Sequence, residues 1–132
     1  MSKSLGNTIE ISASPDEIRK KIKPAFTDPA RLRRTDPGNP DICAIYTWYQ
    51  KFMPEEVELT ATECRSAARG CVDCKMRLAE GVIEHFAPLR DRRAEFENDP
   101  KRLDEIIHAG CERAREVAAR TMEEVHGSMK IG

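Results

Sequence analysis

Hydrophobic residues recur along the second half of the chain at the three- and four-residue spacing of amphipathic helices. In residues 72–96 they stand at Met76, Ala79, Val82, Ile83 and Phe86, and in residues 100–126 at Leu103, Ile106, Ile107, Ala114, Val117, Ala118, Met122 and Val125. This spacing places each set on one face of a helix. We expect a long helix over each range, with a kink before Pro88, and packing through both apolar faces.

Shorter helices are predicted earlier in the chain. Ser14 precedes Pro15 and two acidic residues, an order that is typical of a helix start, so residues 15–22 should be helical. Apolar positions at helical spacing predict further helices over residues 41–52 and 55–68, with a proline between them and a stop near a glycine.

The first third of the chain shows a different pattern. Residues 8–12 alternate in polarity and hold β-branched side chains, which predicts one short strand. The proline-rich segment that follows the first helix carries Arg31, Arg33 and Arg34 and should be an irregular basic connector. The sequence therefore predicts a mainly α fold: a loop, strand and helix in residues 1–34, then a helical region in residues 35–132.

Charge is distributed unevenly along the 132 residues. The chain has 22 Lys and Arg against 23 Asp and Glu, but residues 1–34 carry a net charge of +4 and the remainder −5. An anionic ligand is therefore expected near the N-terminal third. No apolar run reaches the roughly 18–20 residues of a membrane span, and no secretory signal is present, so we expect a cytoplasmic protein with no membrane partner.

Four of the five cysteines form a spaced set. Twenty residues separate Cys43 from Cys64, six separate Cys64 from Cys71, and two separate Cys71 from Cys74. The last two begin a predicted helix, whose N-terminus favours their thiolate forms. Four thiolates from three segments suit a zinc ion or a four-iron four-sulfur cluster, and plain buried thiols are the alternative. Cys111 falls within the last apolar stripe, where core packing is expected.

The opening letters MSKS match the last four of KMSKS, the signature loop of class I aminoacyl-tRNA synthetases. The next segments, LGNTIEISASPDEIRKKIKPAFTD and DPGNPDICAIYTWYQKF, resemble the sequence after that loop in tryptophanyl-tRNA synthetases. GCVDCKMRLAEGVIEHFAPLRDRRAEF resembles the C-terminal helical region of the same family. The resemblance covers the whole chain. It implies the C-terminal part of a tryptophan-tRNA ligase, since the family's Rossmann-type domain, its HIGH-like motif and the first lysine of KMSKS would all precede Met1.

For the N-terminal loop, the resemblance implies contacts with the phosphates of ATP, which enters with Mg. Lys3 would be the catalytic residue that follows the charge growing on the leaving pyrophosphate, and Ser2 and Ser4 would assist it. The complete enzyme would use ATP and tryptophan and form a homodimer, whereas these 132 residues alone are expected to be inactive.

For the helical region, the resemblance implies anticodon binding, with tRNA(Trp) as partner. A subset of the family carries a four-iron four-sulfur cluster on such a cysteine quartet, which favours the cluster, with zinc as alternative. Candidate RNA contacts are the basic residues around the cysteines, Arg65, Arg69, Lys75 and Arg77, although solvated helix faces explain them as well. Trp48 and Tyr49 could stack on a base, but core positions are favoured for both.

Two other readings of the whole chain stay open. One is a free-standing, metal-containing RNA-binding module without aminoacylation activity. The other is a structural helical protein with four buried thiols and no ligand.

Overall fold

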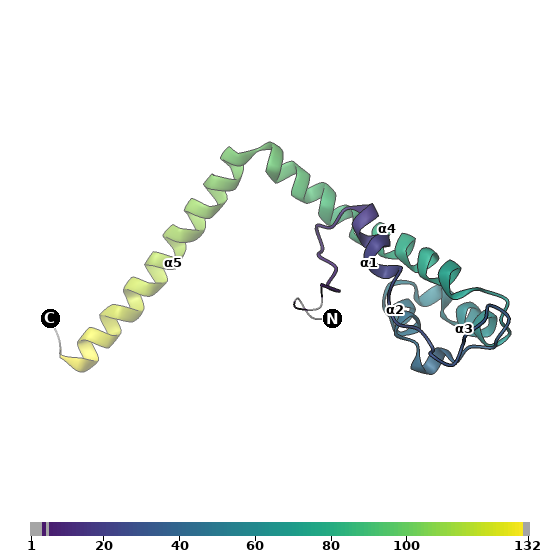
Figure 1. Cartoon of the computed structure of the whole chain (residues 1–132). Helices are drawn as coiled ribbons and strands as arrows, with labels where there is room; N and C mark the ends of the chain where they lie inside the picture. Colours follow the sequence, from purple (N-terminus) through teal and green to yellow (C-terminus); the bar gives the residue numbers. More distant parts are fainter. Residues whose placement is uncertain (1–3, 5, 131–132) are drawn as a thin grey trace. The chain divides into compact units, whose positions relative to one another are not determined.

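The computed structural model describes residue 4 and residues 6–130, and over these residues the protein is mainly α-helical. In chain order its helices are α1 (Pro15–Ile22), the 3-10 turn η2 (Pro40–Ile42), α2 (Ala44–Phe52), the 3-10 turn η3 (Pro54–Glu56), α3 (Val57–Arg65), α4 (Cys71–Asn98) and α5 (Pro100–Met129) (Figure 1). Contacts divide the chain into two compact units, residues 1–90 and 91–132. No helix within the described residues is long and apolar enough to cross a membrane.

The start of α1 is fixed by a reciprocal cap. The Ser14 hydroxyl accepts a hydrogen bond from the backbone N–H of Glu17 at 3.3 Å, and the Glu17 carboxylate accepts one from the backbone N–H of Ser14 at 2.8 Å. Each residue thereby satisfies a backbone donor that a helix end leaves without a partner. The hydrogen bond from the Ser14 backbone is also the main reason that the pKa of Glu17 is lowered. The helix predicted over residues 15–22 is confirmed.

One apolar core joins α1, α2 and the first half of α4. Tyr49 and Ile18 are fully buried in it, and its other buried members are Ile22, Ile45, Met53, Leu78, Ala79 and Val82. Trp48 packs against this core. The apolar stripe predicted for α4 is therefore confirmed as a packing face, and Trp48 and Tyr49 lie beside and in the core, as expected.

A glycine allows α4 to approach the end of α2. A side-chain carbon on Gly81 would lie 2.3 Å from the sulfur of Met53, a separation far too short for two non-bonded heavy atoms. The Met53 side chain is only 2% exposed and occupies the space that a larger residue at position 81 would need. This glycine is therefore required by packing, since no unusual backbone angle is involved.

Helix α3 is shorter than predicted. The helix expected over residues 55–68 begins as the turn η3 and ends at Arg65. The Ser66 hydroxyl donates a 2.8 Å hydrogen bond to the carbonyl of Thr62, and Ala67 adopts a left-handed backbone angle, φ 59°. Local side-chain bonds of this kind compete with helix continuation.

The prediction of a strand over residues 8–12 is wrong. Residues 7–10 have no regular secondary structure, and the backbone N–H of Ala13 donates to the carbonyl of Glu10 in a turn. A strand is stabilised by a hydrogen-bonded neighbour, and none is found among the described residues. An alternating pattern in the sequence does not reveal whether a neighbouring strand is present.

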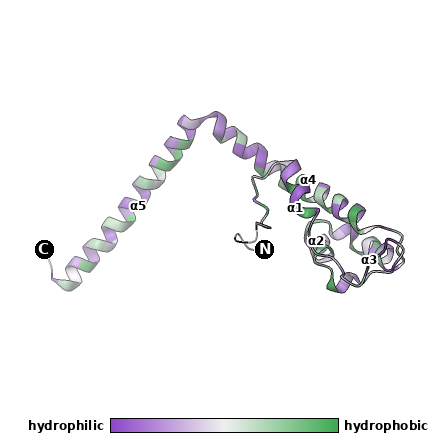
Figure 2. Cartoon of the chain, viewed as in Figure 1, coloured by the Kyte–Doolittle hydropathy of each residue, from purple (hydrophilic) through white to green (hydrophobic). Residues whose placement is uncertain are grey.

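The packing predicted for the apolar stripe of α5 is also wrong for this chain. No residue of α5 is buried, and Ile106, Ile107 and Val117 are each at least half exposed. Hydrophobic and hydrophilic positions alternate along the helix (Figure 2), so the amphipathic pattern is present while its partner surface is not among the described residues. Cys111 is exposed for the same reason, which overturns its predicted place in a core.

Candidate functional site

Four cysteines that are far apart in the sequence line one small cavity. Cys43 caps the start of α2, Cys64 lies near the end of α3, and Cys71 and Cys74 lie in the first turn of α4. The cavity has a volume of about 30 Å³ and is completed by Thr27, Arg31, Ile45, Thr60 and Arg69. The structure therefore brings the whole quartet together, although the sequence predicted Cys43 within a helix rather than at its cap.

Burial opposes the thiolate form that the sequence predicted for Cys74. Burial raises the pKa of Cys74 to about 11, and burial also raises the pKa of Cys64. The desolvation cost of a thiolate therefore exceeds the favourable field of the α4 N-terminus for Cys74. Among the described residues, no three His, Cys, Asp or Glu side chains stand in the geometry of a site for a metal ion.

The irregular basic segment closes one side of the cysteine cavity. Arg31 donates hydrogen bonds from Nη2 to the carbonyls of Arg34 and Arg69, both at 2.9 Å. Its Nε is buried and lacks a hydrogen-bond partner among the described residues. The backbone N–H of Gly38 donates to the carbonyl of Cys64 at 3.0 Å. A side-chain carbon at Gly38 would come within 2.7 Å of the Cys64 sulfur, so only glycine leaves that sulfur in its place.

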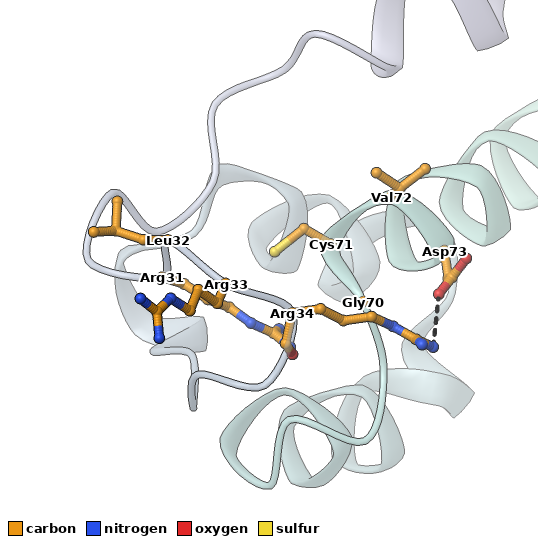
Figure 3. A pocket seen from close by; sticks show the side chains of 8 residues that line it. All are labelled: Arg31, Leu32, Arg33, Arg34, Gly70, Cys71, Val72 and Asp73. Atoms are coloured by element: carbon orange, nitrogen blue, oxygen red, sulfur yellow. Dashed lines mark hydrogen bonds and ion pairs between the residues drawn. The ribbon is translucent and has the colours of Figure 1, made fainter.

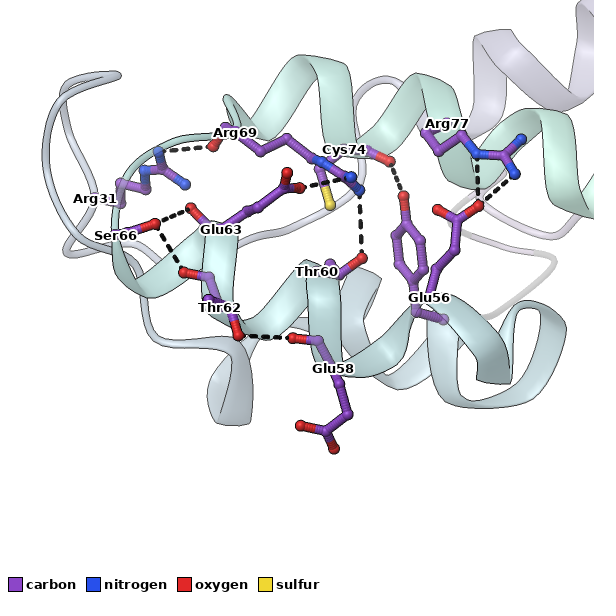
Figure 4. Close-up of polar contacts among 11 residues, drawn as sticks. Arg31, Glu56, Glu58, Thr60, Thr62, Glu63, Ser66, Arg69, Cys74 and Arg77 are labelled. Atoms are coloured by element: carbon purple, nitrogen blue, oxygen red, sulfur yellow. Dashed lines mark hydrogen bonds and ion pairs between the residues drawn. The ribbon is translucent and has the colours of Figure 1, made fainter.

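The core residue Tyr49 is hydrogen-bonded to the backbone of Cys74, the second cysteine of α4. The Tyr49 hydroxyl donates to the backbone carbonyl of Cys74 at 2.9 Å (Figure 4). Burial raises the pKa of this tyrosine above its ordinary value, which keeps the hydroxyl proton available for donation. Helices α2 and α4 therefore contribute to both the cysteine cavity and the apolar core.

Two of the four predicted RNA contacts, Arg69 and Arg77, form ion pairs within the protein. Arg69 lies 2.6 Å from the carboxylate of Glu63, donates to the Thr60 hydroxyl at 3.3 Å, and has a side chain only 19% exposed. Arg77 pairs with Glu56, with its Nε 2.9 Å from the carboxylate (Figure 4). This pairing raises the pKa of Arg77. Both guanidinium groups form ion pairs within the protein, Arg69 with Glu63 of α3 and Arg77 with Glu56 of η3.

The other two predicted RNA contacts, Lys75 and Arg65, make only exposed contacts within the protein. Lys75 donates from Nζ to the carbonyl of Lys23 at 3.1 Å, and Arg65 lies 3.8 Å from the exposed carboxylate of Asp41. An exposed ion pair at that distance contributes little stability. Of the four basic side chains, Arg69 lines the cysteine cavity and the other three do not. Their role in RNA binding stays a prediction.

A larger hollow, which sequence reasoning missed, lies beside the cysteine cavity. It has a volume of about 510 Å³ and is lined by Arg31, Leu32, Arg33, Arg34, Gly70, Cys71, Val72 and Asp73 (Figure 3). We call it the arginine hollow. The run of arginines and the positive charge of the first 34 residues were its only signals in the sequence, because its two walls are almost forty residues apart.

The N-terminal loop is described only in part. Ser2 and Lys3 lie outside the described residues, and Ser4 is exposed. Lys21 of α1 donates from Nζ to the carbonyl of Gly6, and Gly6 has a positive φ of 61°, a conformation that glycine adopts without strain. The predicted roles of Ser2, Lys3 and Ser4 stay predictions.

Known proteins match this chain over nearly its full length. The tryptophan-tRNA ligase of Deinococcus radiodurans is 43% identical over 133 residues, covering 100% of this chain and 40% of that protein. The tryptophan-tRNA ligase of Thermotoga maritima is 41% identical over 133 residues, covering 99% of this chain and 40% of that protein. The chain thus spans about two fifths of the length of these relatives.

Structural similarity agrees with the sequence matches. The crystal structure of tryptophanyl-tRNA synthetase from Campylobacter jejuni superposes with a TM-score of 0.87 and 27% identity, over 98% of this chain and 42% of that one. A second structure of that enzyme, in complex with ADP and tryptophan, gives the same TM-score. The profile of the family described as tRNA synthetases class I (W and Y) matches residues 1–87. The chain therefore belongs to the class I tRNA synthetase family for tryptophan and tyrosine.

Proposed function

We propose that these 132 residues are the C-terminal part of a tryptophan-tRNA ligase, acting in the cytoplasm, and that their helical region binds the anticodon arm of tRNA(Trp). The alignment of nearly the whole chain with tryptophan-tRNA ligases carries this proposal. In the complete enzyme ATP and tryptophan would be the other substrates. The solved structure of the Campylobacter jejuni enzyme in complex with ADP and tryptophan supports that assignment.

Binding of tRNA tests the proposal directly. The chain should bind tRNA(Trp) more tightly than a tRNA for another amino acid, and changing the anticodon bases of tRNA(Trp) should remove that preference. Fluorescence anisotropy at fixed salt measures both, because the electrostatic part of RNA affinity depends strongly on salt. Equal affinity for all of these RNAs would point to the alternative, a general RNA-binding module.

The N-terminal loop is proposed to contact the phosphates of ATP. In the complete enzyme, Lys3→Ala should slow formation of tryptophanyl-adenylate and leave tryptophan affinity unchanged, because its ammonium would stabilise only the charge that develops on the leaving pyrophosphate. Loss of tryptophan binding would show that this role is wrong. Since the chain spans about two fifths of its relatives, we expect no tryptophan-dependent exchange of pyrophosphate into ATP by these residues alone.

The cysteine cavity is proposed to hold a four-iron four-sulfur cluster, with zinc as the alternative. Three observations support a resident metal group: four sulfurs line one cavity, the buried Nε of Arg31 has no partner among the described residues, and Gly38 leaves the Cys64 sulfur unobstructed. Cys43, Cys64, Cys71 and Cys74 would hold the group. A cluster bound there would supply a covalent link between the starts of α2 and α4 and the end of α3.

Chemical analysis distinguishes the two metals. Protein purified without oxygen should contain about four irons and four acid-labile sulfides per chain for a cluster, or one zinc and no sulfide for the alternative. Cys71→Ser should lose the metal and melt at a lower temperature, while Cys111→Ser is the matched control because Cys111 is exposed on α5. Full metal content in Cys71→Ser would contradict the choice of ligands.

A further inference from the structure

The arginine hollow offers two exposed cationic side chains, Arg33 and Arg34, which together form no more than one weak ion pair among the described residues. Arg33 and Arg34 are both exposed. The guanidinium of Arg33 forms no ion pair within the part of the chain that the structure describes. That of Arg34 lies 3.7 Å from the carboxylate of Asp73, and both side chains are more than 60% exposed. A pair of this kind is weak and exchanges readily for another anion. These two groups contrast with Arg69 and Arg77, which are held by short internal ion pairs.

Apolar side chains border the same hollow. Leu32 is 87% exposed and Val72 is 60% exposed, and both line the hollow. Figure 3 shows Leu32 beside Arg31 and Arg33 and Val72 on α4, at the opposite end of the hollow. In the same view the side chain of Arg34 extends past Gly70 toward Asp73. A volume of about 510 Å³ is far larger than a single phosphate requires and lies within the range of pockets that hold molecules of nucleotide size. The combination of guanidinium groups at both ends of the hollow with apolar groups (Figure 3) suits neighbouring RNA phosphates with their attached sugars and bases.

We propose that the arginine hollow binds a short segment of the tRNA, with Arg33 and Arg34 on separate backbone phosphates and Leu32 and Val72 beside its sugars and bases. This inference rests on the proposed tRNA binding and names the surface that performs it. In this proposal Arg33 and Arg34 are the RNA contacts, in place of the four basic residues around the cysteines that the sequence suggested. The carboxylate of Asp73 competes with the RNA phosphate for Arg34, so it limits affinity.

The position of the hollow connects it with the cysteine cavity. Arg31 and Cys71 line both spaces, and Arg31 fixes the shape of the hollow by bonding to the carbonyls of Arg34 and Arg69. The RNA surface and the cysteine cavity therefore share one wall. Metal content must be measured in every variant, so that a change in affinity is not confused with loss of the metal.

Affinity for a synthetic hairpin with the stem and loop of the tRNA(Trp) anticodon tests the inference in the full 132-residue chain. The double variant Arg33→Ala with Arg34→Ala should bind at least about tenfold more weakly. Its slope of log affinity against log salt should fall by roughly 0.7 to 0.9 for each RNA phosphate that the variant no longer neutralises. Asp73→Asn should bind more tightly than the wild type, a change that misfolding does not produce. Lys51→Ala, which removes one exposed charge of α2 outside the hollow, should bind as the wild type does.

The possible failures are distinguishable. If the wild type binds the hairpin and the double arginine variant binds it equally well, or if Lys51→Ala weakens binding as much, the hollow is not the RNA surface. Weaker binding by Asp73→Asn with its metal retained would also overturn the inference. If the wild type does not bind the hairpin, the proposed function itself fails, and the assignment of the hollow fails with it.

Discussion

Gly81→Ala should destabilise the first unit because the new methyl group has no room. It would lie 2.3 Å from Sδ and 2.6 Å from Cγ of Met53. These atoms are in the middle of the side chain, so rotation of the terminal methyl group does not relieve the contact. Alanine gains about 0.8 to 1 kcal/mol over glycine in a helix interior. Overpacking a core costs about 1 to 3 kcal/mol, and displacing a buried methionine forfeits about 1.5 to 3 kcal/mol. The two costs less the helix gain predict a net loss of about 1.5 to 5 kcal/mol.

Urea unfolding followed by Trp48 fluorescence measures this loss. Trp48 is the single tryptophan of the chain and packs against the core, so its emission reports on the first unit. Gly110→Ala is the control, because nothing lies within 4 Å of a side-chain carbon at that helical glycine. It should leave the free energy of unfolding unchanged or raise it slightly.

A double-mutant cycle decides whether the contact with Met53 is the cause. Met53→Ala alone should cost about 2 to 5 kcal/mol by leaving a cavity. In the double variant, the methyl group introduced by Gly81→Ala would fill part of that cavity, so the combined loss should be smaller than the sum by about 1 kcal/mol or more. Additive losses, or a Gly81→Ala variant as stable as the wild type, would refute the reasoning.

Three other contacts give further predictions. Tyr49→Phe removes the hydroxyl that donates to the carbonyl of Cys74 and should lower the free energy of unfolding by about 1 kcal/mol in the same urea assay. The pKa of Glu17 is lowered from 4.5, chiefly by the Ser14 backbone hydrogen bond, so its contribution is present above that pH and is lost as the pH falls. The difference in melting temperature between Glu17→Gln and the wild type should therefore disappear in acid, and a difference that is constant with pH would contradict the cap. Gly38→Ala should displace the Cys64 sulfur and reduce metal content per chain, while Gly110→Ala, its control, should retain the metal.

Local signals in the sequence predicted the local structure well. Helix α1 has its predicted bounds because a Ser14 cap, a proline and acidic residues all act within one turn. The apolar stripe of α4 was also informative, since its members pack into the core. The cysteine spacing predicted which thiols converge, because two of them lie in one helical turn and the others lie near helix ends.

The failures concern features that depend on distant parts of a protein. The stripe of α5 has the right period, but period does not reveal whether a partner surface is present, and Cys111 is exposed as a result. The segment of residues 8–12 alternates as a strand does, yet the described residues supply no neighbouring strand. The arginine hollow could not be predicted because Arg31 reaches the carbonyl of Arg69 across 38 positions of the chain, a contact that no local pattern encodes.

The exposed stripe of α5 has a consequence for motion as well as for packing. A helix of 30 residues extends about 45 Å at 1.5 Å per residue, and helices of this kind owe most of their stability in proteins to the burial of an apolar face. In this chain α5 buries no residue, whereas α4 buries Leu78, Ala79, Gly81 and Val82. The backbone hydrogen bonds of α4 and α5 follow the same helical pattern, but those of α5 should therefore open much faster than those of the buried part of α4. Amide hydrogens of α5 should exchange with solvent through local fraying, while those around Val82 should exchange only when the first unit unfolds as a whole.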